Sequence, residues 1–221
     1  MTRPDLVIFD CDGVLVDSEP VSNRVLATNL ARHGLTLTLA ECMVAFVGNS
    51  MTGVRDKARG MGADLSEGWI EEIYAETYTA LRAGVAIIEG IPDLLDALDG
   101  AGIAYCVASN GSDEKMEITL GATGLAPRFD GRCYSAHALG VSKPDPDLFL
   151  HAAAACGAAP PACLVIEDSP SGAIAARRAG MACLGYVPEG HPDRLGAEGA
   201  TVIRHMDAVA AHIGLAPAQS V

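Results

Sequence analysis

The sequence has no run of about 18 apolar residues, so a membrane-spanning helix is not expected. Its seven cysteines form no C-x-x-C pair and its six histidines show no metal-ligand spacing, which argues against a structural zinc site. Basic residues are scarce: 15 Lys and Arg stand against 28 Asp and Glu, a formal net charge of −13. This balance repels polyanions, so we expect neither nucleic acid nor an anionic membrane surface as a partner.

Apolar residues are plentiful: they make up 50% of the 221 residues, whereas charged residues make up only 19%. This composition is typical of a folded chain with a sizeable core, either one domain or one domain carrying an insertion. Asp10 and Asp12 interrupt the first apolar stretch, so the pattern of a secretory signal peptide is missing. We therefore expect a soluble, cytoplasmic protein.

The first apolar segment, residues 5–9, is short and continuous, which is typical of a strand buried on both faces. The following segment, 20–82, shows helical periodicity throughout. In its first helix Val21, Val25, Ala27 or Thr28, and Ala31 recur at helical spacing, and the pattern stops at Gly34. Helices are predicted over 21–34, 38–46, 51–59 and 66–81.

After residue 84 strands and helices alternate. Strands are predicted over 104–108, 132–135, 163–166, 182–186 and 201–203, and helices over 91–101, 113–121, 146–156, 170–179 and 206–213. Single helices between strands imply right-handed crossovers and a parallel sheet. The predicted fold class is therefore α/β, with a Rossmann-like core of residues 1–16 and 85–221. The helical segment 17–84 is expected to form a cap domain inserted after the first strand.

Polar side chains follow the predicted strands at the points where these end. The residues concerned are Asp10, Asp12, Ser109, Asn110, Glu167 and Asp168, with Lys143 just ahead of helix 146–156. In an open parallel sheet the carboxyl ends of the strands meet at one edge, where ligands bind. We therefore expect these side chains to form one site.

The chemistry of such a site follows from its charges. Carboxylates held close together repel each other unless a cation lies between them, and an all-oxygen set of ligands suits Mg²⁺. Lys143 would add a second cation against a phosphate dianion, and Ser109 a neutral donor. Asp10 can attack phosphorus and form an aspartyl phosphate, while Asp12 protonates the leaving oxygen and then deprotonates water. Gly13 lets the backbone turn away after this pair.

Four motifs in this order resemble those of the haloacid dehalogenase-like superfamily of phosphatases and phosphomutases. They are FDCDGVLVDSEP (9–20), SNG (109–111), SKPDP (142–146) and VIEDSPSG (165–172). The first and fourth are highly specific together, and the four span the whole chain. The resemblance implies the Rossmann-like core with an inserted cap.

The resemblance also implies roles for single residues. Asp10 would be the nucleophile and Asp12 the general acid/base. Mg²⁺ would be bound by Asp10, by the backbone carbonyl of Asp12 and by Asp168, with Glu167 binding through water or supporting the ligands. The transferring phosphoryl group would be held by Ser109, Asn110 and Lys143.

Two branches of the family stay open. A phosphomutase like β-phosphoglucomutase is expected to carry an Arg after the cap glycine and a His at the hinge, where this chain has Met51 and Ser22. The DSEP sequence at 17–20 looks more like the sugar- and polyol-phosphate phosphatases. We therefore expect a Mg²⁺-dependent phosphatase of a small phosphorylated metabolite, with the mutase as the alternative. Substrate contacts from the cap are expected at Glu19, Asn23, Gly48, Asn49 and Ser50.

A receiver-like phosphoacceptor module, which stores a phosphoryl group, is a remote alternative of a different class. Receivers also combine an Asp, Mg²⁺, a hydroxyl residue and a Lys on an α/β sheet. The D-x-D spacing at 10–12 and the inserted helical segment disfavour this interpretation. A long-lived aspartyl phosphate would favour it.

Overall fold

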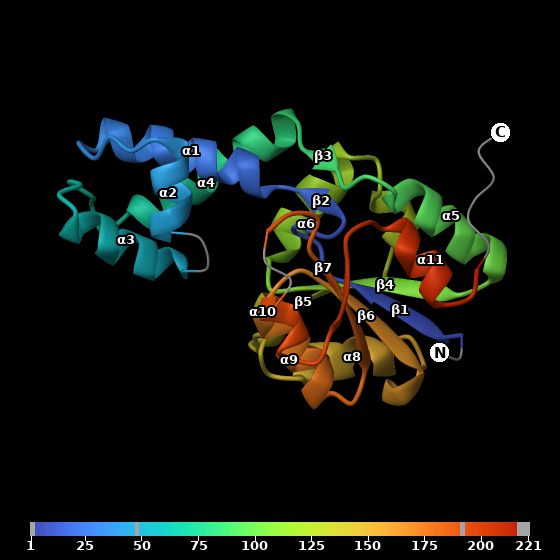
Figure 1. Cartoon of the computed structure of the whole chain (residues 1–221). Coiled ribbons are helices and arrows are strands. Elements are labelled where there is room, and N and C mark those ends of the chain that lie inside the picture. The colour runs from blue at the N-terminus through green and yellow to red at the C-terminus, as the bar shows by residue number, and fades with distance from the viewer. Residues whose placement is uncertain (1–2, 47–48, 191–192, 216–221) are drawn as a thin grey trace. The chain divides into compact units, whose positions relative to one another are not determined.

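The computed structural model describes residues 3–46, 49–190 and 193–215, and the chain divides into two compact units (Figure 1). The first unit comprises Met1–Asp17 and Ala86–Val221, and the second comprises Ser18–Val85. The boundaries expected from the sequence each lie one residue away from these.

The first unit is built on a six-stranded parallel sheet with the strand order β5-β4-β1-β6-β7-β8. Its strands are β1 (Leu6–Phe9), β4 (Ala104–Ser109), β5 (Cys133–Ser135), β6 (Cys163–Glu167), β7 (Ala182–Tyr186) and β8 (Thr201–Ile203). The first strand of the chain therefore lies between β4 and β6, in the middle of the sheet. All four of its residues are fully buried, as expected of a strand covered on both faces. The predicted α/β fold class is confirmed.

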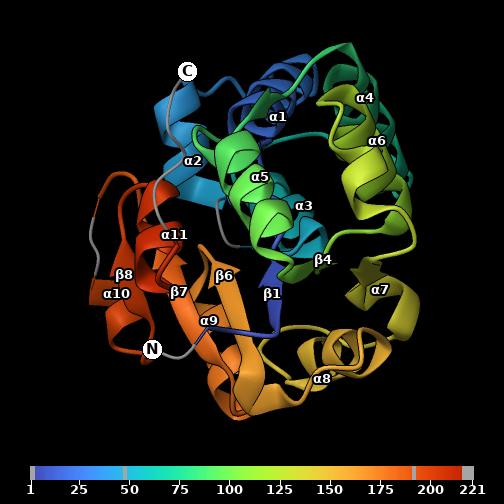
Figure 2. The same ribbon diagram turned by 90° about the vertical axis from the view of Figure 1, so that its right-hand side faces the viewer.

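Helices connect these strands and cover both faces of the sheet (Figures 1 and 2). They are α5 (Ile91–Ala101), α6 (Asp113–Ala122), α7 (Ala136–Leu139), α8 (Asp147–Ala155), α9 (Pro170–Arg178), α10 (Asp193–Gly196) and α11 (Asp207–His212). Helices α8 and α9 lie on one face, while α5 packs against α11 on the other. Within the described ranges, no helix is both long enough and apolar enough to cross a membrane.

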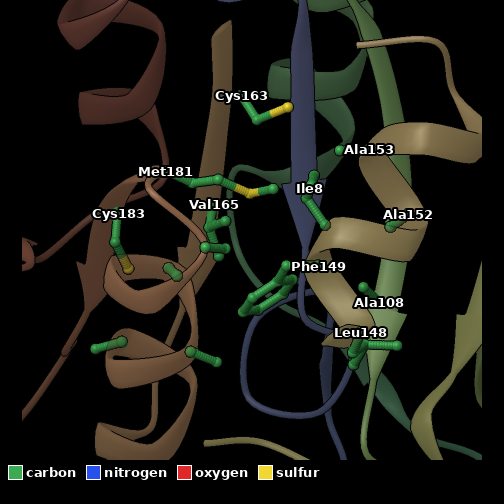
Figure 3. Packing of buried hydrophobic residues seen from close by; sticks show 14 of the residues in the cluster. Ile8, Ala108, Leu148, Phe149, Ala152, Ala153, Cys163, Val165, Met181 and Cys183 are labelled. Atoms are coloured by element: carbon green, nitrogen blue, oxygen red, sulfur yellow. The ribbon is translucent and has the colours of Figure 1, made fainter. Parts of the chain in front are cut away.

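Close packing on both faces fixes the strands that position the site. On one face Ile8 and Val165 pack with Phe149 of α8 in a cluster rich in alanine, whose small side chains let the helices approach the sheet (Figure 3). On the other face Phe9, Tyr105 and Phe129 meet edge to face, with ring centroids 5.4 to 6.5 Å apart. Burial of each large apolar side chain contributes about 1.5–3 kcal/mol, so the central strands are held firmly.

A two-stranded antiparallel ribbon, which the sequence did not predict, pairs β2 (Val16–Asp17) with β3 (Ala86–Ile87). It joins the segment that leaves the first unit to the segment that returns to it. Each strand has only two residues, too few for an alternating pattern to be recognised.

The second unit consists of four helices, α1 (Glu19–Arg32), α2 (Leu39–Phe46), α3 (Met51–Gly60) and α4 (Trp69–Ala83). Its apolar core includes Leu30, Trp69 and Ile73, and the indole N–H of Trp69 donates a hydrogen bond of 2.7 Å to Asn29 Oδ1. Asn29 is fully buried, and its amide also donates to two carboxylates of α4. These hydrogen bonds offset the cost of burying a polar side chain.

The predicted first helix is present as α1, and Val25 and Ala27 of its apolar pattern pack at the edge of the core, but most of the buried positions are others. Ala31 is exposed and Val25 is only half-buried, whereas Asn23, Leu26 and Asn29 are buried. The helix turns its amides inward because α4 and the α1 backbone supply hydrogen-bond partners for them.

Candidate active site

Four buried polar side chains meet at the carboxyl end of the central strands. Asp10 follows β1 directly, Ser109 ends β4 and Glu167 ends β6, and these three strands are neighbours in the sheet. Lys143 comes from the loop between α7 and α8. Lys143 is 6% exposed and Glu167 only 1%, an unusual degree of burial for charged side chains. Such a group at this edge of a parallel sheet indicates a ligand site.

Lys143 connects two of the buried carboxylates. Its Nζ lies 2.5 Å from Asp10 Oδ1 and 2.7 Å from Glu167 Oε1, and 4.9 Å from the ring centroid of Phe149. Burial alone would lower the pKa of Lys143, but the two negative charges and their hydrogen bonds outweigh it and raise the pKa above its usual value. Lys143 is therefore a fixed positive charge beside Asp10.

Burial is also the main influence on Asp10. It raises the pKa of this carboxyl to about 7, and the charge of Glu167 adds to the effect while that of Lys143 opposes it. A second cation beside Asp10 would favour the ionised carboxylate, which is the form that can attack an electrophile.

Glu167 is fixed by the start of α9. Its Oε2 accepts hydrogen bonds from the backbone N–H of Ser169 at 2.7 Å and from the Ser169 hydroxyl at 2.8 Å. Gly172 leaves room for the carboxyl group, since a Cβ at this position would lie 1.9 Å from Glu167 Cδ. Both oxygens of Glu167 therefore have partners, which suits a residue that holds Lys143. Its expected part in metal binding stays a prediction.

Three carboxylates could hold a metal ion. Asp10, Glu167 and Asp168 each offer an oxygen, and these oxygens lie within 4.8 Å of one another. This all-oxygen set fits Mg²⁺. Gly13, at φ +78°, makes the space for Asp168, because a Cβ there would lie 2.1 Å from Asp168 Oδ2. The side chain of Asp12 is not in this group, so its expected contribution to the metal is the backbone carbonyl.

Asp12 instead forms an ion pair that the sequence reasoning missed. Lys115 Nζ lies 2.8 Å from Asp12 Oδ2. Burial lowers the pKa of Lys115, but the charge of Asp12 and their hydrogen bond outweigh this and raise it. Lys115 lies in the first turn of α6, which begins directly after the SNG motif. Only residues at the strand ends were considered as site residues. The signal in the sequence for Lys115 was its position one helical turn beyond the SNG motif.

The SNG segment is tied to its surroundings by its own hydrogen bonds. The Ser109 hydroxyl accepts from the N–H of Gly111 at 3.1 Å, and Asn110 Oδ1 accepts from the N–H of Lys143 at 3.0 Å. The Ser135 hydroxyl donates to the Gly111 carbonyl at 2.7 Å. The polar residues expected at the strand ends therefore all belong to one edge of one sheet.

Comparison with known proteins assigns this arrangement to a family. The family model described as haloacid dehalogenase-like hydrolase matches residues 4–180, which is most of the chain. The chain is a haloacid dehalogenase-like hydrolase. This finding confirms the resemblance inferred from the four motifs, and with it the interpretation of the chain as an enzyme.

Among haloacid dehalogenase-like proteins, the chain is 32% identical to the 6-phosphogluconate phosphatase of Escherichia coli K12 over 193 residues, 86% of each chain. It is also 32% identical to hexitol phosphatase A of the same organism over 182 residues, 78% of each chain. A solved structure of a family hydrolase from Deinococcus radiodurans R1, with bound phosphate and sodium, is 31% identical. The two structures share a TM-score of 0.84 over 99% of this chain and 100% of that one.

The second unit of this haloacid dehalogenase-like chain contains the five residues that were expected to contact the substrate from the cap. Asn23 is buried and its amide donates to the Glu19 carbonyl at 2.9 Å. Asn49 donates to the end of α2, and Ser50 caps the start of α3 by accepting from Gly53. Gly48 lies outside the described residues. A role in substrate recognition stays a prediction for all five.

Proposed function

We propose that the protein is a Mg²⁺-dependent phosphatase that hydrolyses a small phosphorylated metabolite, a sugar or polyol phosphate. The observation that carries the proposal is the buried Asp10 carboxylate, placed 2.5 Å from Lys143 and within a cluster of two further carboxylates. The names of the two curated relatives, a phosphatase of 6-phosphogluconate and one of hexitol phosphates, support the substrate class.

In the first half of the reaction Asp10 attacks phosphorus. A bond forms between an Asp10 carboxylate oxygen and phosphorus, and the bond from phosphorus to the ester oxygen breaks. Asp12 gives a proton to that ester oxygen, and the alcohol leaves. The positive charge of Lys143 and the donors of Ser109 and Asn110 stabilise the transferring phosphoryl group.

In the second half water attacks the aspartyl phosphate. Asp12, now a carboxylate, takes a proton from the water as its oxygen bonds to phosphorus. The bond between phosphorus and the Asp10 oxygen breaks, inorganic phosphate leaves and the Asp10 carboxylate is restored. Asp12 ends protonated, as it began, so the cycle closes.

The residues present suit Mg²⁺, held by the carboxylates of Asp10 and Asp168 and the backbone carbonyl of Asp12. When bound, it would supply positive charge that offsets the repulsion among the carboxylates and between them and the phosphate dianion. Glu167 keeps Lys143 in place beside this group through its 2.7 Å contact. The proposal includes the cytoplasmic location expected from the sequence, where such metabolites occur.

The mutase alternative is disfavoured at two positions of the second unit, where Met51 and Ser22 stand in place of the expected Arg and His; Arg55 or Arg82 could compensate only by a different geometry. A mutase must bind a second phosphate, yet Met51 packs against the apolar core of that unit. The Ser22 hydroxyl donates to the Ser18 carbonyl at 3.0 Å and offers no imidazole. These contacts favour hydrolysis over transfer within a sugar.

The test is phosphate release from a panel of phosphorylated metabolites with Mg²⁺: 6-phosphogluconate, hexose and hexitol phosphates, phosphoglycolate and nucleotides. We expect clear turnover of the sugar or polyol phosphates. No release from any compound would overturn the proposal. Conversion of β-glucose 1-phosphate to the 6-phosphate, once a bisphosphate primer is added, would establish the mutase instead.

A further inference from the structure

We propose that Lys115 is a positioning residue of this reaction, which holds one oxygen of the Asp12 carboxyl group and so orients the other for proton transfer to the leaving oxygen. The inference rests on the phosphatase reaction proposed above and adds a residue to it. The direct observation is the contact of 2.8 Å between Lys115 Nζ and Asp12 Oδ2.

The surroundings of the pair fix it from both sides. Gly111 lies directly beside it, since a Cβ there would be in van der Waals contact, 3.7 Å from both Asp12 Oδ2 and Lys115 Cδ. One helical turn further along α6, the buried Thr119 contacts Cys11, with 3.7 Å between its hydroxyl and the sulfur. Helix α6 therefore contacts the segment 10–12 at two points, through Thr119 at Cys11 and through Lys115 at Asp12. The contact of Lys115 is the charged one.

The position of Lys115 in α6 is not explained by helix formation. The first turn of a helix favours negative charge, since its backbone N–H groups form the positive end of the dipole. Asp113 and Glu114 in the same turn follow this preference. Lys115 goes against it and finds its compensating charge in Asp12, at the end of a distant strand.

The use of lysine in the whole chain points the same way. Of the 15 basic residues 12 are arginine, and the three lysines are Lys57, Lys115 and Lys143. Two of these three pair with the two motif aspartates: Lys143 with Asp10 and Lys115 with Asp12. An ammonium group is a compact charge that meets a single carboxylate oxygen, whereas guanidinium is a planar fork suited to two. Lysine therefore suits these two contacts better than arginine would.

The proposal predicts a dependence on the leaving group. A proton donor must lie within hydrogen-bond reach of the oxygen that it protonates. Without Lys115 the Asp12 side chain loses this charged contact and is held less firmly in its orientation, so proton transfer to an alkoxide leaving group slows. Nitrophenolate and acetate leave without a proton, so their departure does not need this orientation.

The experiment compares kcat/KM of the wild type and Lys115→Met for two kinds of substrate. One is the alkyl phosphate turned over in the panel above, and the other is p-nitrophenyl phosphate or acetyl phosphate. The parameter kcat/KM reports the steps up to loss of the leaving group. For the alkyl phosphate we expect kcat/KM to fall by at least about tenfold, which is a part of the 10²–10⁴-fold that a complete general acid contributes. For p-nitrophenyl phosphate or acetyl phosphate we expect kcat/KM to fall by less than about threefold. Lys57→Met, at an exposed lysine of the second unit, is the matched control with unchanged values.

Two further measurements separate positioning from a general structural effect. In an Asp12→Asn background Lys115→Met should cause no further loss with the alkyl phosphate, because the lysine acts only through Asp12. Lys115→Arg keeps the charge and should give a value between those of the wild type and Lys115→Met. Equal losses for both kinds of substrate, no loss, or an additive loss in the double variant would each overturn the proposal. An inactive wild type would instead contradict the proposed phosphatase function.

Discussion

Asp10 uses its backbone and its side chain for different purposes. Its N–H donates to the Ile166 carbonyl at 2.9 Å and so continues the pairing of β1 with β6 one residue beyond the strand. Its carboxylate turns to Lys143. The last hydrogen bond of the sheet thus fixes the backbone of the residue that we propose as the nucleophile, which limits its freedom before any substrate binds.

Asp10→Asn removes the attacking oxygen while keeping the size of the side chain. We expect turnover of the panel substrates to fall by at least about 10⁴-fold, the scale on which loss of a covalent nucleophile acts. Phosphate release and circular dichroism would be measured together, with Asp5→Asn at an exposed position as the control. Appreciable remaining turnover in the variant would exclude Asp10 as the nucleophile.

Individual residues of the site differed in how far the sequence could reveal them. Asp10 and Glu167 follow short apolar strands, so topology alone predicts that they share an edge. Lys115 could not be found in this way, because its place depends on how closely α6 approaches the D-x-D segment. The burial of Asn23 and Asn29 was also missed. Periodicity assigns apolar side chains to the inner face of a helix and does not reveal hydrogen-bond partners for an amide.

Among the elements, α9 does more than connect two strands. Its capping residue Ser169 accepts from the N–H of Gly172 at 3.1 Å and donates to Glu167 Oε2, and so joins the helix start to the site. The first turn must also pass close to the Glu167 carboxyl group, which Gly172 permits. The VIEDSPSG motif therefore encodes a packing requirement as well as ligands.

Gly172→Ala should be destabilising although alanine is the better helix former. We expect a loss of about 1–3 kcal/mol in the free energy of unfolding, because the new Cβ overlaps Glu167. Gly100→Ala in α5, where no atom lies within 4 Å of the added carbon, should instead gain about 0.5–1 kcal/mol. Chemical denaturation of both variants would be compared, and a stabilised Gly172→Ala would contradict the overlap.

The end of α1 carries a pH-dependent contact. His33 lies with Nδ1 at 3.0 Å from the Asp64 carbonyl and Nε2 at 3.0 Å from Glu72 Oε1, so both nitrogens face acceptors. This favours the protonated ring, and the hydrogen bond to Glu72 raises the pKa of His33, although burial and Arg32 oppose it. The contribution to stability is thus complete below the unfolded pKa of about 6.5 and is lost as the pH rises through the folded pKa.

His33→Gln should accordingly lower the free energy of unfolding more at about pH 5.5 than at about pH 9. Urea denaturation at the two pH values would show the difference. An equal loss at both would mean that the contact with Glu72 involves the neutral ring.

In the whole molecule the order of the longer helices and of the sheet strands could be predicted, whereas the short helices α7 and α10 and the small β2–β3 ribbon could not. Every predicted strand appears in the sheet within one residue of its expected bounds. Short continuous apolar runs and single connecting helices leave few other arrangements. Two-residue strands carry no such pattern, and their pairing depends on segments about seventy residues apart in the chain.

The net charge of −13 and three neighbouring carboxylates lead us to expect that divalent cations stabilise the folded molecule. A cation that binds only the folded state raises its stability, by about 2.7 kcal/mol at a hundred times the dissociation constant. We expect Mg²⁺ to raise the thermal unfolding temperature more than NaCl of equal ionic strength. Asp168→Asn should remove most of this increase and the exposed Asp145→Asn none of it. An unchanged increase in Asp168→Asn would mean that Mg²⁺ binds elsewhere.

The central place of β1 has a consequence for protein synthesis. Leu6 is translated well before both of its neighbours in the sheet, Ala104 and Cys163. Until then the most apolar strand of the chain has no partner and needs protection from aggregation. No nascent chain that stops before Glu167 can therefore assemble the site.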